Sequence, residues 1–198
     1  SDLGSGAGRR SAGDQVSVRD SVIEVLSAWE APSEEQSTLR HAVLAFVLAR
    51  PDACERACVP GHITASVAVL DHTRSSVLLT LHPRLGRWVQ LGGHCEPEDD
   101  DILAAARREG VEESGIADLV VLPELAALHV HPLTCSLGVP TRHLDLQFVA
   151  VALPDAAIAV SDESLDLRWW PVSGLPEGTD HALAYLVSRA THQVRSKR

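Results

Sequence analysis

The chain reads GGHCEPEDDDILAAARREGVEESGI over residues 92–116, and the fold that we predict is built around this stretch. Its apolar and small residues indicate a helix over about residues 101–114. On that helix Glu109, Glu112 and Glu113 lie at positions i, i+3 and i+4, so their carboxylates share one face. Three like charges on one face destabilise a helix unless a positive charge lies among them.

The surroundings of these glutamates favour a bound cation over a solvated charged face, which is the alternative. Arg108 can bridge to Glu112, but one arginine does not neutralise three acids. A hard divalent cation such as Mg²⁺ or Mn²⁺ would do so through oxygen ligands. Gly92-Gly93 allows a tight turn and a close backbone approach, and Ala104–Ala106 allow close packing on a sheet. Gly110 costs the helix about 1 kcal/mol relative to alanine.

This segment resembles the Nudix signature, which is Gly, five residues, Glu, seven residues, then Arg-Glu-U-x-Glu-Glu-x-Gly-U, with U apolar. Residues 108–116 read REGVEESGI and match the five charged or glycine positions of the second half. The first half begins at Gly93, but it is one residue longer, and the acidic run Glu98–Asp101 replaces its glutamate. Asp99 has the right spacing from the glycine, whereas Asp100 has the right spacing from the arginine.

The resemblance implies an α/β fold of the Nudix type, an α/β/α sandwich with a mixed sheet, here with added N-terminal helices. It implies a pyrophosphohydrolase that uses Mg²⁺ (or Mn²⁺) to let water attack phosphorus in a nucleoside diphosphate derivative. Glu112 and Glu113 would be metal ligands, together with the carbonyl of Gly93. Glu109 would bind metal or act as general base, and Arg108 would hold a glutamate in place.

Other site residues are expected outside this helix. Glu163 resembles an extra acid that some Nudix enzymes place on a later loop near the metals, so it is a candidate metal ligand; the alternative is a loop carboxylate without a role at the site. Trp88, Trp169 and Trp170 fit base stacking or, by default, core packing. His94 resembles part of the Gly-Gly-His-x-Glu form of one Nudix subgroup. The candidate substrate contacts are His94, Trp88, His131, His143 and Arg87.

Two further patterns could in principle hold zinc. Cys54, Cys58 and His62 are spaced four apart, but no fourth ligand is evident, so we expect thiols without a metal. Histidines also cluster at His129, His131 and His143, where we favour phosphate contacts or core hydrogen bonds. The cysteines, namely Cys54, Cys58, Cys95 and Cys135, do not resemble a disulfide framework.

The remaining pattern predicts one domain with an extension. We expect a disordered tail over residues 1–15, a helical extension over 16–60 and the Nudix domain over 61–195. The second helix should begin near Ser33, where Gln36 completes the spacing of a capping box. The expected helices cover 18–29, 33–50, 101–114 and 179–194, and the expected strands cover 63–70, 76–81, 87–90, 119–122, 125–130, 143–151 and 165–170.

Composition narrows the partners of the 198-residue chain. The net charge is −10 and Lys197 is the only lysine. Extended nucleic-acid binding needs clustered cations and is therefore disfavoured. No apolar stretch is long enough for a membrane span, so we expect a cytoplasmic protein with a nucleotide-type diphosphate as its small-molecule partner. The arginine bias suggests a bacterial genome, and a homodimer is an option because dimerisation is common in this fold.

Two other functions compete with hydrolysis. One is a Nudix-fold module that senses a nucleotide without cleaving it, which an intact glutamate triplet disfavours. The other is an allylic diphosphate isomerase, a class that uses a cysteine and an acid. Cys95 lies in the right neighbourhood for that chemistry, but its motif context does not match.

Overall fold

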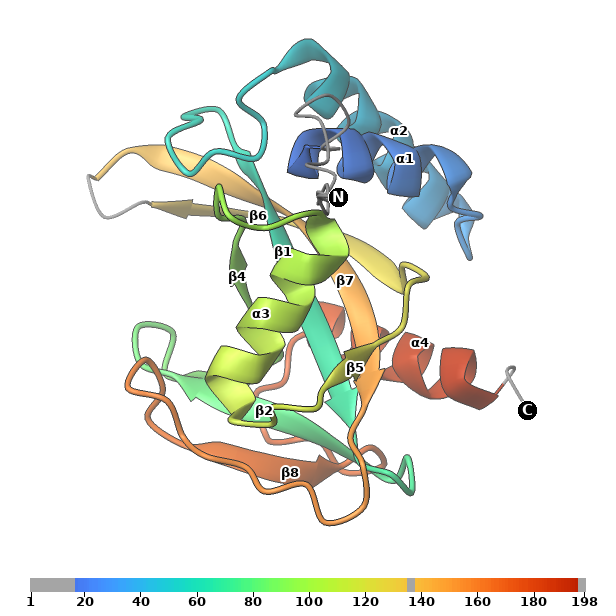
Figure 1. The fold of residues 1–198 in the computed structure, drawn as a ribbon, viewed down its shortest axis with the longest axis vertical. Helices are drawn as coiled ribbons and strands as arrows, with labels where there is room; N and C mark the ends of the chain where they lie inside the picture. The colour runs from blue at the N-terminus through green and yellow to red at the C-terminus, as the bar shows by residue number, and fades with distance from the viewer. Residues whose placement is uncertain (1–16, 135–137, 196–198) are drawn as a thin grey trace, which may run out of the picture.

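A computed structural model describes residues 17–134 and 138–195 of the chain. The predicted disordered tail and Cys135 lie outside the described residues. The described part forms a mixed eight-stranded sheet with helices on both faces, as Figure 1 shows. The α/β sandwich with N-terminal helices is therefore confirmed, whereas the division into units at residue 60 stays a prediction.

The sheet is built around two parallel strands, β1 (His62–Leu70) and β7 (Pro140–Val151), which pair from His62↔His143 to Leu70↔Val151. The other strands are β2 (Ser76–His82), β3 (Arg87–Val89), β4 (Leu91–His94), β5 (Val120–Val121), β6 (Ala127–Thr134) and β8 (Leu167–Pro171). The edge of β1 away from β7 pairs with two antiparallel strands, β4 along one part and β2 along another. In the same way, β6 and β5 pair with different parts of the outer edge of β7.

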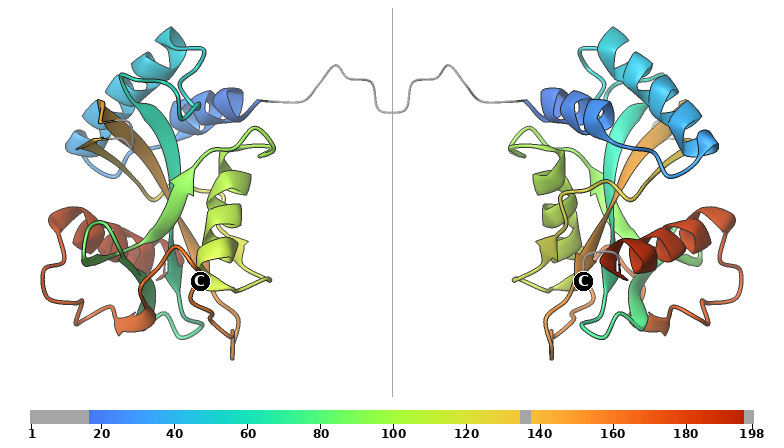
Figure 2. Two further views of the ribbon diagram at one scale, coloured as in Figure 1. Left: turned by 90° about the vertical axis from the view of Figure 1, so that its left-hand side faces the viewer. Right: turned by 90° about the vertical axis from the view of Figure 1, so that its right-hand side faces the viewer.

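Alternating residues of the central strand supply two separate cores. Every residue of β1 is buried. Ile63, Ala65 and Val67 pack toward the face that carries the N-terminal helices and α3 (Ile102–Ser114). Ala68 and Leu70 pack on the opposite face with α4 (His181–Arg195). Figure 2 shows α3 and α4 on opposite sides of the sheet.

The N-terminal helices α1 (Val18–Ala28) and α2 (Glu34–Ala49) cap one another. Arg19 of α1 donates to the carbonyl of Val47 at 2.9 Å, near the end of α2. Arg40 of α2 donates to the carbonyl of Trp29 at 3.1 Å, just past the end of α1. These bonds satisfy carbonyls that a helix end leaves without a partner.

The predicted capping box at α2 is half correct. Ser33 accepts a hydrogen bond from the backbone N–H of Gln36, as expected of an N-cap residue. The Gln36 side chain does not reach back to Ser33, because it pairs with the backbone of Leu128 instead. Its amide donates to the Leu128 carbonyl at 3.0 Å and accepts from the Leu128 N–H at 2.7 Å. The side chain thereby covers part of the edge of β6 and ties α2 to the sheet.

The helix α3 follows the sequence pattern closely. Asp101 is its N-cap and accepts from the Ala104 N–H at 2.7 Å, and Gly115 ends it with φ 75°. Gly110, whose place in the helix the sequence leaves unexplained, faces β1. A Cβ there would lie 2.7 Å from Leu119 Cδ2 and 2.9 Å from Val67 Cγ1. The glycine therefore lets the helix lie closer to the sheet than any side chain would allow.

The predicted tight turn at Gly92-Gly93 is wrong. These residues form β4, which pairs antiparallel with β1 in the register Ser66↔Gly92 and Ala65↔Gly93. The close backbone approach expected of the glycines is present. A Cβ on Gly92 would lie 2.6 Å from backbone and side-chain atoms of Ser66.

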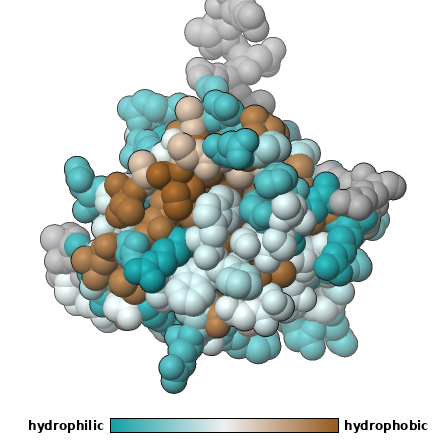
Figure 3. Space-filling model, turned by 90° about the horizontal axis from the view of Figure 1, so that it is seen from below, coloured by the Kyte–Doolittle hydropathy of each residue, from teal (hydrophilic) through white to brown (hydrophobic). Residues whose placement is uncertain are grey.

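Some of the surface is apolar. Figure 3, which views the molecule from below, shows apolar side chains gathered beside polar ones. Exposed large apolar residues include Leu153, Val160 and Leu165 in the segment between β7 and β8. The homodimer stays a prediction. Among residues 17–134 and 138–195, none of the helices combines the length and apolarity that crossing a bilayer requires.

We expect Gly110→Ala to lower the free energy of unfolding by about 1 kcal/mol, because overpacking costs about 1–3 kcal/mol and outweighs the gain of about 1 kcal/mol in helix propensity. Urea unfolding measures the change. The matched control is Gly174→Ala, where a Cβ meets nothing within 4 Å. Equal or greater stability of the Gly110 variant would show that α3 does not pack this closely.

Candidate active site

Glu109 and Glu113 lie where α3 faces β4, and Glu112 lies beside them at the solvent-exposed edge. The side chain of Glu109 is 14% exposed, whereas that of Glu112 is 58% exposed. The Gly92 N–H donates to Glu113 Oε2 at 2.9 Å. We call Glu109, Glu112 and Glu113 the glutamate cluster.

Gly93 lies directly against this cluster. A Cβ on Gly93 would be 2.5 Å from Oε1 of Glu109 and 2.7 Å from its Oε2. Any side chain there would displace the carboxylate. The absence of a Cβ thus brings the β4 backbone to the glutamate cluster, as a site that combines backbone and carboxylate oxygens requires.

Arg108 holds the parts of the site together. Its guanidinium donates to the His94 carbonyl at 2.8 Å and to Glu109 Oε1 at 3.0 Å. It also reaches Glu112 Oε2 at 3.2 Å, which is the i, i+4 bridge expected from the sequence. It also forms a bidentate ion pair with Asp99 in the loop before α3, with Nε 2.9 Å from Oδ1 and Nη2 3.1 Å from Oδ2.

The residues of the acidic run before α3 have different roles. Asp99 is the residue that pairs with Arg108, and its carboxylate also accepts from the Glu96 N–H at 2.8 Å. Asp101 caps α3, whereas Asp100 between them is exposed. The extra residue is therefore absorbed in the loop, and the spacing from Gly93 identifies the residue that pairs with the arginine.

The electrostatics of the site call for more positive charge than Arg108 supplies. Burial, together with the charge of Glu109, raises the pKa of Glu113 to about 7. Burial also raises the pKa of Glu109. Glu163, predicted from a later loop, lies close enough to raise the pKa of both residues. Crowded carboxylates with raised pKa values fit a hard divalent cation, whose binding would favour their ionised form.

The histidines predicted to contact substrate lie on the other face of the sheet from α3. His94, His131 and His143 come from β4, β6 and β7, and His131 is paired with His143 in register. The ring centroids of His129 and His131 are 5.4 Å apart in a stacked arrangement, so the shared strand face expected for these two is confirmed.

Beneath these rings lies a buried carboxylate. Asp145 is 2% exposed and accepts from Ser66 Oγ at 2.7 Å, from Thr64 Oγ1 at 2.9 Å and from Gln147 Nε2 at 3.0 Å. Burial raises its pKa. The donors of these hydrogen bonds are side chains of β1 and β7, while His129 is the partner of Asp145 in the β6–β7 register.

Arg87 and Trp88 lie on β3, which pairs with β2, whereas the glutamate cluster lies against β4. Arg87 pairs with Asp180 at 3.0 Å. Burial lowers the pKa of His131, and the charge of Arg87 adds to this lowering. Trp88 packs edge-on against Trp170 with centroids 5.3 Å apart. Trp169 packs against the opposite core. The three tryptophans are thus partly buried in the cores, which was the default expectation.

The cysteine zinc site considered from the sequence is not formed. Hydrogen bonding to Cys54 raises the pKa of the Cys95 thiol, so these two thiols face each other. Cys58 lies beside Arg50 and Asp52. Spacing along the chain did not predict these directions, because they depend on how the loop before β1 folds back.

Sequence reasoning grouped His62 with Cys54 and Cys58 and missed the histidines that surround it in the structure. In the part of the chain that the structure describes, His62, His94 and His143 each offer a ring nitrogen within 4.8 Å of the other two, so the three could share one ion. His62 and His143 are direct partners in the parallel pair. Their separation of 81 residues hides that pairing from the sequence, and only their occurrence near the starts of two strands hints at it.

Comparison with known proteins places the chain in a family. The family model of the NUDIX domain matches residues 60–190, which is more than half of the chain. A search of the curated proteins found no match. A NUDIX-family hydrolase from Clostridium perfringens is 21% identical, with 67% of this chain and 97% of that chain covered and a TM-score of 0.50.

The names of two other similar structures mention a nucleotide-type compound. A C. elegans Ap4A hydrolase in a binary complex is 17% identical over 68% of this chain and 98% of its own, with a TM-score of 0.53. The NUDIX domain of Shewanella oneidensis NrtR, complexed with ADP ribose, is 21% identical over 76% and 97%, also with a TM-score of 0.53. The family match and the shared fold agree, so the chain belongs to the NUDIX family.

Proposed function

We propose that the protein uses Mg²⁺, with Mn²⁺ as an alternative, to hydrolyse a diphosphate linkage in a nucleoside diphosphate derivative. The observation that carries this proposal is the glutamate cluster against the backbone of Gly93, with one arginine among its carboxylates. The Ap4A and ADP ribose named for the two similar structures support a nucleotide-type substrate. The cytoplasmic location and bacterial origin stay predictions from the sequence.

Each residue of the cluster has a distinct part in this proposal. Glu112, Glu113 and the carbonyl of Gly93 would hold the metal, with Glu163 as a further ligand. When bound, the metal polarises a phosphoryl oxygen and makes water a better nucleophile. Glu109, whose pKa is raised by burial, would complete the ligands or accept a proton from the attacking water.

Arg108 serves as a positioning residue in this scheme. Its guanidinium is engaged by Asp99, by two glutamates and by the His94 carbonyl. Few of its donors are left for a substrate phosphate. Its function is then to fix Glu109 and Glu112 relative to β4, so that the metal ligands are held in place before the substrate binds.

A pocket lies on the α4 side of the sheet, across the sheet from the glutamate cluster, and no residue of the cluster lines it. It has a volume of about 400 Å³ and is lined in part by Gln36, His129, Gln147 and Tyr185. His129 in the lining of this pocket stacks on His131, and His131 contacts His143 edge-on. We call His129, His131 and His143 the histidine row. Arg87, Trp88 and His131 stay candidate substrate contacts on this side, whereas His94 and His143 gather with His62 and suit another ligand.

We expect Glu112→Gln and Glu113→Gln each to lower kcat by about 10²–10³-fold or more, because each removes a carboxylate that would hold the metal ion, and the metal ion offsets the negative charge of the transition state. Product release is measured with nucleoside triphosphates, nucleotide sugars, dinucleoside polyphosphates and oxidised nucleotides, with Mg²⁺ and Mn²⁺. Glu177→Gln, which changes an exposed glutamate in the segment between β8 and α4, is the matched control.

The products separate the competing functions. Normal turnover in both cluster variants would rule out this site. Saturable nucleotide binding with no product under either metal would favour a sensing module. An isomerised allylic diphosphate with the diphosphate retained would favour the isomerase.

Metal affinity should depend on pH in a defined direction. The pKa of Glu113 in the metal-free protein is about 7, so the carboxyl is protonated below pH 7 and the metal must displace that proton. We expect Mn²⁺ affinity to fall up to about tenfold per pH unit below 7 and to level off above it. Titration followed by electron paramagnetic resonance at pH 6, 7 and 8 measures this slope.

Glu113→Gln provides the control for that experiment. The variant should bind Mn²⁺ more weakly and with a shallower pH dependence, because its amide carries no titrating proton. Equal Mn²⁺ affinity of the wild type at pH 6 and pH 8 would contradict the assignment of Glu113 as a ligand.

A further inference from the structure

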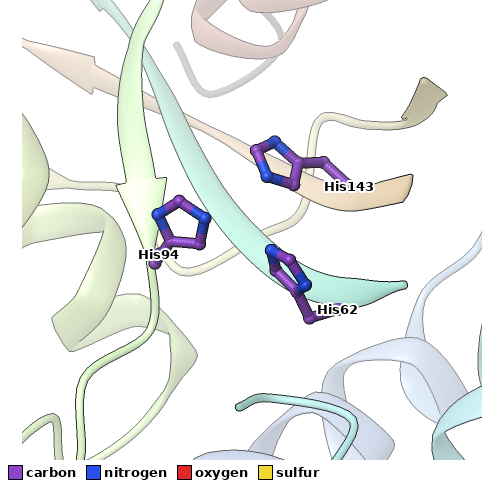
Figure 4. Close-up of side chains that lie close together, drawn as sticks. All are labelled: His62, His94 and His143. Atoms are coloured by element: carbon purple, nitrogen blue, oxygen red, sulfur yellow. The ribbon is translucent and has the colours of Figure 1, made fainter. Parts of the chain in front are cut away.

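Three histidines meet on the face of the sheet opposite α3. Figure 4 shows the rings of His62, His94 and His143 turned toward one another from β1, β4 and β7. Their centroids form a nearly equilateral triangle, with separations of 5.1, 4.9 and 5.0 Å. One ring nitrogen from each lies within 4.8 Å of the others.

The sheet itself creates this triangle. His62 and His143 are direct partners in the parallel pair, and His94 pairs with Thr64, two residues along β1 from His62. Side chains alternate between faces along a strand, so all three point to the same side. The rings are therefore mounted on three hydrogen-bonded strands, which hold a site more rigidly than loops do.

Two of the ring nitrogens are buried with no hydrogen-bond partner. His62 is 3% exposed, and its Nε2 has no partner among the described residues; the same holds for the buried Nε2 of His143. The other nitrogen of His62, Nδ1, lies 3.4 Å from the carbonyl of Cys58. A histidine that ligates a metal commonly makes such a bond with its second nitrogen, which orients the ring.

The chemistry of the triangle favours a metal cation over an anion. Burial lowers the pKa of His94 to about 4 and of His143 to about 3, and it also lowers the pKa of His62. The rings are therefore neutral at pH 7 and offer lone pairs, as a metal requires. Arg56 also contributes to these lowered values, but it is exposed, so solvent screens its charge.

We propose that His62, His94 and His143 bind a Zn²⁺ ion at a second site, separate from the glutamate cluster. Three imidazole nitrogens match a zinc site with a fourth position left for water or substrate. Nitrogen donors suit zinc, whereas the carboxylates across the sheet suit Mg²⁺, so the two sites select different metals. The zinc would tie β4 to β1 and β7 one residue beyond Gly93 and so fix the strand that supports the glutamate cluster.

Cobalt is the probe for this site, because four-coordinate Co²⁺ absorbs strongly in visible light. We expect purified wild-type protein, in excess Mg²⁺, to bind about one Co²⁺ per chain with this absorption, and Zn²⁺ to abolish it. Zn²⁺ should also raise the melting temperature. Absence of a stoichiometric cobalt spectrum in the wild type would overturn the proposal.

Variants test which histidines hold the ion. His94→Gln and His143→Gln should each abolish the cobalt absorption, with folding verified by circular dichroism. His129→Gln is the matched control, because this histidine lies outside the triangle and should leave the spectrum unchanged. An equal effect of all three variants, or an unchanged spectrum in His143→Gln, would refute the site.

Two additional measurements distinguish the zinc site from an anion site and from the glutamate cluster. Inorganic phosphate in place of zinc tests the anion site: a rise in melting temperature with phosphate, lost in His143→Gln, together with no zinc effect, would refute the metal assignment. Glu112→Gln should keep zinc binding even without activity. The zinc proposal therefore stands or falls independently of the proposed hydrolysis.

Discussion

The parallel pairing of β1 with β7 positions both candidate sites. Its nine residue pairs run without interruption from His62↔His143 to Leu70↔Val151. Because β1 is buried along its whole length, one set of its side chains supports α3 and the other faces α4. β4 pairs with the outer edge of β1 and carries Gly93 and His94, and β6 pairs with the outer edge of β7 and carries His129 and His131. A shift of one residue in this register would move each set to the wrong face.

The glutamate site depends on a backbone approach that only glycine permits. Gly93 leaves room for the Glu109 carboxylate, and Gly110 lets α3 lie close to β1. Arg108 then connects α3 to the loop through Asp99 and to β4 through the His94 carbonyl. The carboxylates are partly buried with one cation among them, which raises the pKa of Glu113 and suits the site to a divalent metal.

The two faces of the sheet offer different donor chemistry a short distance apart along one strand. On the α3 side, β4 contributes its backbone beside oxygen donors. One residue later, His94 contributes a ring nitrogen to the opposite side. Hard and borderline cations prefer these donors in different order. With both proposed metals bound, one strand would link a catalytic metal to a second metal that stiffens its support.

The sequence by itself determined the features that depend on local spacing. These include α3 with its caps at Asp101 and Gly115, the shared face of its glutamates, and most strand positions, because helix and strand periods are local properties. Only the tertiary structure decided which acid meets Arg108, why Gly110 is required and which histidines come together. Those outcomes depend on pairing between segments far apart in the chain. The register of β1 with β7 is set by the packing of both sheet faces, and no local pattern encodes it.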